Sequence, residues 1–194
     1  PGVSISNISL IAAGVDTESD ATLRLRCRLR WPSLGSGATA DAYRYWALSA
    51  DPTITKVRIL DQNPRGQGTV DVIIWGEGGL GNNAVAAADT YIQQRKPITA
   101  SVQVYAATAR AIAVTATITL RSGFVGATQS EITARLAALQ RNVQIGGVVY
   151  RSAIIEALFG TYVINVNLSA PAADVALATN EAAVLTLSAT YIEV

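Results

Sequence analysis

The sequence predicts an α+β fold in which two small α/β-sandwich-like units follow one another, preceded by an N-terminal strand and helix. Three observations support this prediction. Short runs with apolar residues at every second position alternate with runs that have the 3.6-residue period of helices. Breaks rich in Gly, Pro and Ser separate these runs. The 194 residues suffice for one ordinary domain or two small ones.

Residues 1–33 are predicted to be a strand and a helix that remain from an upstream region. The segment Val3–Ile11 is strand-like and reads as one strand of a sheet begun earlier in the chain. The sequence starts at Pro1 and contains no Met. We therefore expect the chain to be a fragment of a longer protein.

The segment that follows gives two conflicting signals. Asp16–Asp20 is acidic, and Thr17 with Asp20 fits a helix capping box. Residues 23–30 instead alternate Leu or Cys with Arg, a strict period of two that by itself indicates a strand. We predict a helix here, with the strand as the alternative.

The first predicted unit covers residues 34–109, and local capping, alternation and turn residues define each of its elements. The expected elements are a helix over 40–50 with Thr39 or Asp41 at its cap, strands Thr55–Leu60 and Thr69–Trp75 around an Asn63–Gly66 turn, a helix over 83–95 with Val85, Ala88 and Ile92 on one face, and a strand Ser101–Tyr105.

The second predicted unit covers residues 110–194 and repeats the same kinds of element. The expected elements are a strand Ala113–Arg121, a helix Gln129–Val143 with Ile132, Leu136, Leu139 and Val143 on one face, a second helix Tyr150–Phe159 ended by Gly160, and strands Tyr162–Leu168 and Val184–Val194 linked through Pro171. Each unit is small for a self-sufficient core, so we expect the two to pack on each other or on partners.

The composition argues against most kinds of chemistry. There is no His, which removes the usual general base and metal ligand, and the single Cys27 permits neither an internal disulfide nor a thiolate cluster. We expect Cys27 to be a small buried hydrophobic residue rather than a reactive thiol. The net charge of +1 gives no global attraction to nucleic acid or to an anionic membrane. We predict no enzyme activity, no catalytic, metal or cofactor-binding residue, and no nucleic-acid, membrane or small-molecule partner.

One motif offers an alternative function. Gly76, Gly78 and Gly81 form a G-x-G-x-x-G pattern after a predicted strand and before a predicted helix, the context of a dinucleotide fingerprint. That fingerprint also needs an acidic residue about 20 positions later, and no Asp or Glu occurs between Asp89 and Glu131. The preceding strand is expected to pair in an antiparallel hairpin. A nucleotide-binding enzyme domain using Gly76–Gly81 therefore remains only the alternative.

Aromatic and arginine side chains are candidate interface anchors, because Trp, Tyr and Arg dominate binding hot spots. The aromatic ones serve equally well as core anchors, and both interpretations stay open. The arginines that alternate over 24–30 are expected to form a solvated or partner-facing basic edge rather than a phosphate-binding surface. The candidate anchors are Trp31, Tyr43, Tyr45, Trp46, Trp75, Arg24 and Arg28.

The order of these segments resembles the baseplate J-like family of contractile phage tails and related injection machines. The similar segments are Glu18–Arg26, Tyr43–Ala47, Pro52–Leu60, Gly66–Ile74, Arg95–Val104 and Ala113–Leu120, followed by a C-terminal part containing VVYRSAIIEALFG and VINVNLSAPAADVALATNEAAVL. No single motif is specific, but the ordered set covers nearly the whole chain. Family members are usually longer, with a region that would precede Pro1.

The resemblance implies a structural role in the virion. Members form wedges of a baseplate ring around the central spike and tube and link that ring to the contractile sheath. The expected partners are further copies of the chain, other wedge subunits, and sheath-initiating and spike- or hub-side proteins. The expected location is the tail baseplate of a bacteriophage or phage-like particle, assembled in the host cytoplasm.

Overall fold

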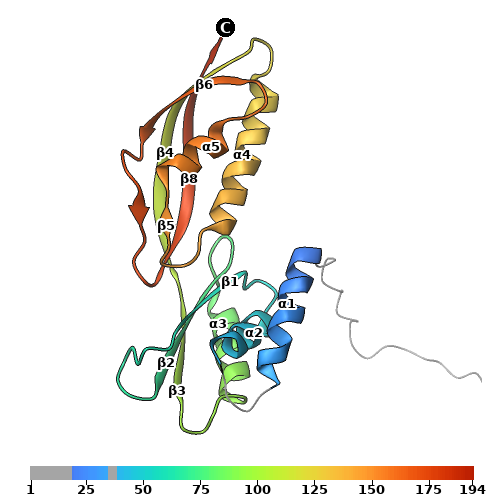
Figure 1. Ribbon diagram of the computed structural model, residues 1–194, viewed down its shortest axis with the longest axis vertical. Helices are drawn as coiled ribbons and strands as arrows, with labels where there is room; N and C mark the ends of the chain where they lie inside the picture. Colours follow the sequence, from blue (N-terminus) through green and yellow to red (C-terminus); the bar gives the residue numbers. More distant parts are fainter. Residues whose placement is uncertain (1–18, 35–38) are drawn as a thin grey trace, which may run out of the picture.

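The computed structural model describes residues 19–34 and 39–194, and it arranges them as two sheet-and-helix units stacked along the long axis of the molecule (Figure 1). The described residues form five helices and eight strands. One three-stranded sheet has the order β1-β2-β3, a second has the order β6-β4-β8, and β5 and β7 form a two-stranded ribbon. The predicted α+β class is confirmed.

Helix α1 (Asp20–Ser33) settles the first ambiguity of the sequence. The helix prediction is confirmed and the strand alternative over 23–30 is wrong. The N-cap is Ser19, whose Oγ accepts a hydrogen bond from the Thr22 backbone N–H at 3.3 Å. The proposed capping residue Thr17 and the predicted strand Val3–Ile11 lie outside the described residues.

Helix α2 (Ala40–Ala50) begins at Thr39, whose hydroxyl accepts from the Ala42 backbone N–H at 3.3 Å. Thr39 is one of the two predicted caps. Tyr43 and Trp46 lie one turn apart and meet edge to face, with ring centroids 5.2 Å apart. These rings form part of a buried cluster between α2, α3 (Asn82–Gln93) and the first sheet.

In the first sheet, β1 (Lys56–Leu60) pairs with β2 (Thr69–Trp75) in the predicted antiparallel hairpin. Strand β2 also pairs in parallel with β3 (Ser101–Ala106), which the chain reaches through α3. Val72 and Ile74 on one face of β2 join the helix-covered core, whereas Ile73 and Trp75 on the other face belong to a separate buried cluster. Strand β2 is therefore buried on both faces.

The second sheet is built on β4 (Thr108–Leu120), which pairs antiparallel with β6 (Val163–Ala170) and parallel with β8 (Glu181–Glu193). Strand β4 starts five residues before the predicted Ala113, because β8 pairs with it from Thr108 onward. Only Ala107 separates β3 from β4, so one nearly continuous extended segment runs through both units (Figure 1).

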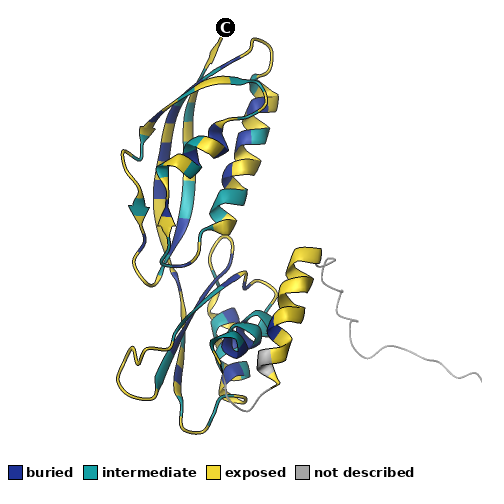
Figure 2. Cartoon of the chain, in the orientation of Figure 1, coloured by how far each residue is buried: buried dark blue, intermediate teal, exposed yellow. Residues whose placement is uncertain are grey.

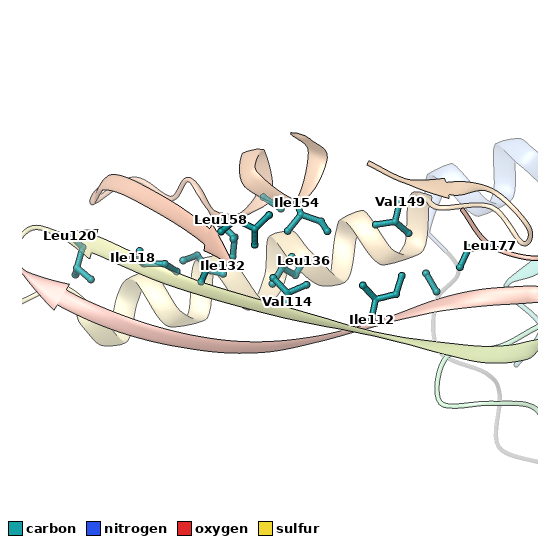
Figure 3. Packing of buried hydrophobic residues seen from close by; sticks show 14 residues of the cluster. Ile112, Val114, Ile118, Leu120, Ile132, Leu136, Val149, Ile154, Leu158 and Leu177 are labelled. Carbon is teal, nitrogen blue, oxygen red and sulfur yellow. The ribbon is translucent and has the colours of Figure 1, made fainter. Parts of the chain in front are cut away.

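Helices α4 (Val125–Asn142) and α5 (Arg151–Leu158) cover one face of this sheet (Figure 1). Every second side chain of β4 points toward these helices. There it packs against Ile132, Leu136, Ile154 and Leu158, as Figure 3 shows. The predicted helix face of residues 132, 136, 139 and 143 thus lies against the core, with Leu139 and Val143 at its margin. The ribbon strands β5 (Val148–Val149) and β7 (Val175–Ala176) close one end of this core.

The connection between α5 and β6 is fastened to α4 by the Glu131 carboxylate and by Arg135, whose Nη1 donates to the Phe159 oxygen at 2.7 Å. Glu131 accepts hydrogen bonds from the Thr161 backbone N–H at 2.9 Å and the Thr161 hydroxyl at 3.2 Å, and it pairs with Arg135 at 3.1 Å. The Thr161 backbone donor, assisted by that hydroxyl and by Arg135, lowers the pKa of Glu131. A lowered folded-state pKa means that the carboxylate stabilises the fold above its ordinary pKa and loses this effect as the pH falls.

We predict that Glu131→Gln lowers the urea midpoint of unfolding at pH 7 and that the difference from the wild type disappears well below pH 4.5, the ordinary value for this carboxyl. The measurement is urea unfolding at several pH values. The matched control is Glu156→Gln, because Glu156 is an exposed carboxylate on α5. This change should alter the urea midpoint little at any pH. A Glu131→Gln difference that is the same at pH 3 and pH 7 would contradict the assigned role of the charge.

Candidate assembly surfaces

The aromatic residues predicted as anchors separate by burial. Tyr43, Trp46 and Trp75 are 3%, 6% and 4% exposed, so in this chain they are core residues. Trp31 is 79% exposed. Tyr45 is half-buried on α2 and accepts a hydrogen bond from an arginine of α1. Of these five rings, Trp31 is therefore the one most available to a partner.

Helix α1 is exposed along nearly its whole length (Figure 2). Leu29, 6% exposed, is its one buried side chain among those described. The prediction that Cys27 is buried is wrong, because it is exposed. The reason is geometric: at about 100° per residue, Cys27 lies two residues and some 200° around the helix from Leu29.

The side of α1 opposite Leu29 gathers four exposed side chains, which we call the α1 outer face: Leu23, Cys27, Trp31 and Leu34. Arg24 and Arg28, both predicted anchors, are exposed and border this face. Arg30 instead reaches α2, where its Nη1 donates to the Tyr45 hydroxyl at 3.1 Å and its guanidinium lies 5.6 Å from the ring centroid.

The second surface of interest is internal, where the two units meet. Ile73, Trp75, Ala107, Ile145 and Ala182 form one buried cluster to which both units contribute, and we call this region the joint. Trp75 therefore anchors the contact between the units. In the sequence, the apolar residues Ile73 and Trp75 at every second position of β2 indicate that this face is covered. The pattern does not indicate which part of the protein covers it.

Two basic side chains of β1 reach across the joint and donate hydrogen bonds to the second unit. Lys56 is 9% exposed, and its Nζ donates to the backbone oxygens of Gln140 at 2.7 Å and Val143 at 2.8 Å. Arg58 Nη1 donates to the Ile145 oxygen at 2.6 Å. The Gln140 and Val143 carbonyls lie at the C-terminal end of α4, which has unpaired acceptors and the negative end of the helix dipole.

Burial lowers the pKa of the Lys56 amine, and the Glu77 carboxylate opposes part of that shift. Sequence reasoning missed Lys56 and Arg58. The available signal was their spacing in KVRIL, where two cations share one face of a strand whose other face is apolar.

The glycine-rich loop also borders the joint. Gly78 and Gly79 have φ values of 83° and 94°, and a side chain at Gly76 would collide with the Thr53 carbonyl oxygen. The turn alone therefore requires three of the glycines. Glu77 of this loop lies 4.0 Å from Arg141 of α4, so its carboxylate is directed to the second unit.

A shallow groove runs between α4 and β8. It is lined by small or polar residues of α4 and by consecutive residues of β8 together with Tyr191, namely Gln129, Ser130, Thr133, Ala134, Ala137, Leu185, Thr186, Leu187, Ser188, Ala189 and Tyr191. Strand β8 has a strand partner on one side only among the described residues. Near the joint, Gln140 Oε1 accepts from the Leu185 backbone N–H at 2.8 Å and so fills one position of this edge.

Within residues 19–34 and 39–194, no group of three or more His, Cys, Asp or Glu side chains is placed to hold a metal ion. In the same ranges no helix combines the length and apolar character needed to cross a membrane.

Comparisons with known proteins give two consecutive family matches. Residues 35–106 match the baseplate J-like central domain, and residues 112–187 match the baseplate J-like protein C-terminal domain. A search of curated proteins found no match.

Among solved structures, the chain is similar to a chain in the cryo-EM structure of the anti-feeding prophage (AFP) baseplate, 6-fold symmetrised, with a TM-score of 0.59 and 16% identity. The match covers 87% of this chain and 42% of that one, so the chain spans less than half the length of that relative.

We predict that Lys56→Met weakens the joint and lowers the free energy of unfolding by about 2 kcal/mol, because the α4 carbonyls lose their charged donor. Urea unfolding followed by tryptophan fluorescence and far-UV circular dichroism measures this. The matched control is Lys96→Met, since Lys96 Nζ donates only within its own loop, to the Ala100 oxygen at 2.6 Å. An equal loss in the free energy of unfolding in both variants would contradict the assigned role of Lys56 in the joint.

We also predict that calorimetric titration with nicotinamide and adenine nucleotides detects no binding, because the loop itself carries the Glu77 carboxylate and no Asp or Glu follows between Asp89 and Glu131 to hold a ribose. Micromolar binding that is lost on Gly81→Val would restore the nucleotide-binding alternative. Binding unaffected by that change would place the nucleotide elsewhere.

Proposed function

The chain belongs to the baseplate J-like family, and on that premise we propose that it is a structural part of the baseplate of a contractile phage tail or phage-like injection machine. The observation that carries the proposal is the pair of matches in family order, central domain then C-terminal domain, over residues 35–106 and 112–187. The fold shared with a chain of the anti-feeding prophage baseplate agrees with this assignment.

We further propose the division predicted from the sequence, with an N-terminal part over 1–33, a first α+β domain over 34–109 and a second over 110–194. Separate buried clusters on either side of Ala107 support this division. A part that transmits force between neighbours needs domains held in a fixed relation. The buried Lys56 ammonium and the Trp75 cluster supply such a connection.

The proposed role is wedge formation in the ring around spike and tube, with links to the sheath. Its partners would be further copies of the chain, wedge subunits, and sheath-initiating and hub-side proteins. The proposal includes no turnover, cofactor, nucleic acid or membrane. Assembly would take place in the host cytoplasm, with the finished baseplate in the virion. Interfaces of roughly 800 Å² per partner suit such a subunit.

We predict that peptide mass mapping of purified contractile particles, with baseplates detached from tubes, finds this chain in the baseplate fraction at ring-like stoichiometry. The tube and sheath fractions of the same preparation are the control. If the chain occurs only in the soluble lysate and never in particles, the proposed function is wrong.

A further inference from the structure

Helix α1 exposes more apolar surface than a solvated helix requires. On the α1 outer face, Leu23, Trp31 and Leu34 are 45%, 79% and 62% exposed. Scattered exposed apolar residues are ordinary, but a contiguous apolar stripe on one side of a helix marks an interaction surface. The outer face is such a stripe, since its four members are spaced by four, four and three residues along the chain.

The opposite side of α1 packs against the chain at Leu29, although Leu25 one turn before it is 43% exposed. Leu29 is buried, and the Arg30 contact with Tyr45 further fastens α1 to α2. The helix therefore packs on α2 of the first unit, while the residues of its outer face are exposed in the described part of the chain. Spacings of three and four are those of a seam between two packed helices, so the shape of the face suits another helix.

The charges around the outer face limit what can cover it. Over its described length α1 holds four arginines and one acidic residue, Asp20. Asp20 pairs with Arg24 at 3.6 Å, with both side chains about four-fifths exposed, which is a weak contact in water. A second copy of α1 on this face would bring arginines against arginines. An acidic partner would instead gain from Arg24 and Arg28.

We propose that the α1 outer face docks an amphipathic helix of another baseplate subunit, one whose apolar seam is bordered by Asp and Glu. This inference rests on the proposed function for the kind of assembly involved. Trp31 is its anchor, since a large ring at the centre of a seam contributes most to binding, and Arg24 and Arg28 fix the register through ion pairs. Nucleic acid would leave the apolar centre of the face uncovered, so a protein helix fits the whole surface better.

The test is photo-crosslinking in assembled particles. The chain is produced with p-benzoylphenylalanine replacing Trp31, particles are purified and irradiated, and the crosslinked peptides are sequenced. We expect a helical segment of a different subunit with acidic residues flanking its apolar positions. The matched control carries the same amino acid in place of Gln67, on the exposed loop between β1 and β2, and should not capture that segment. Crosslinks to another α1, to a strand, to lipid or to nucleic acid would overturn the proposal.

Cys27 offers a second readout that leaves the face unaltered. It is the sole cysteine of the sequence and is exposed in the free chain. We expect N-ethylmaleimide to modify the Cys27 peptide at least about tenfold more slowly in baseplates than in the free chain, because burial in an interface blocks access. Equal rates would refute the docking while the baseplate role stands. Absence of the chain from particles would instead refute the role itself.

The charge component has its own variant. The double change Arg24→Glu and Arg28→Glu should reduce incorporation into baseplates by about tenfold or more, since it turns attraction into repulsion. The double change Arg110→Glu and Arg121→Glu, at exposed sites on and beside β4, applies the same charge change away from α1. Circular dichroism of both variants checks folding. If the two folded variants are incorporated into baseplates equally, the proposal of an acidic partner is wrong.

Discussion

The Lys56 ammonium lies where the first sheet meets the second unit, and it donates to two backbone oxygens at the end of α4. A charge this buried requires partners that replace water, and the end of a helix supplies unpaired carbonyls together with a favourable dipole. The Arg58 contact with Ile145 and the cluster around Trp75 extend the same contact surface. Ala107 alone separates β3 from β4, so the backbone also passes directly from one unit to the other at the joint. The relation of the two units follows from these constraints together.

Much of the fold follows from local physics. The Thr39 cap, the hairpin strands, α3 and the core face of α4 all come from capping, alternation and helical period, and these signals are local. The helix α1 was predictable only because its cap signal outweighed a strand-like alternation. The parallel pairing of β2 with β3, and of β4 with β8 from Thr108, was not predictable in the same way. Those pairings depend on residues far apart in the chain.

The candidate anchors show the limit of sequence reasoning about sites. Tyr43 and Trp31 belong to the same residue class, yet one is in the core and the other is almost wholly exposed. Their exposure is decided by which side of each helix the body of the protein covers. Cys27 was placed wrongly for the same reason. Lys56 was overlooked because a lysine in a strand usually faces water, and only the three-dimensional neighbour turns it into a link.

The chain belongs to the baseplate J-like family, its two units are joined through a buried contact, and we propose that the exposed α1 receives a neighbouring subunit. The most direct measurement is a cryo-EM map of the baseplate from contractile particles purified from cells that produce this chain. We predict density for both units in the ring, with Lys56 at the end of α4 and a helix of another subunit over Trp31. A complete baseplate map with no density for this chain would contradict its proposed role as a structural part of the baseplate.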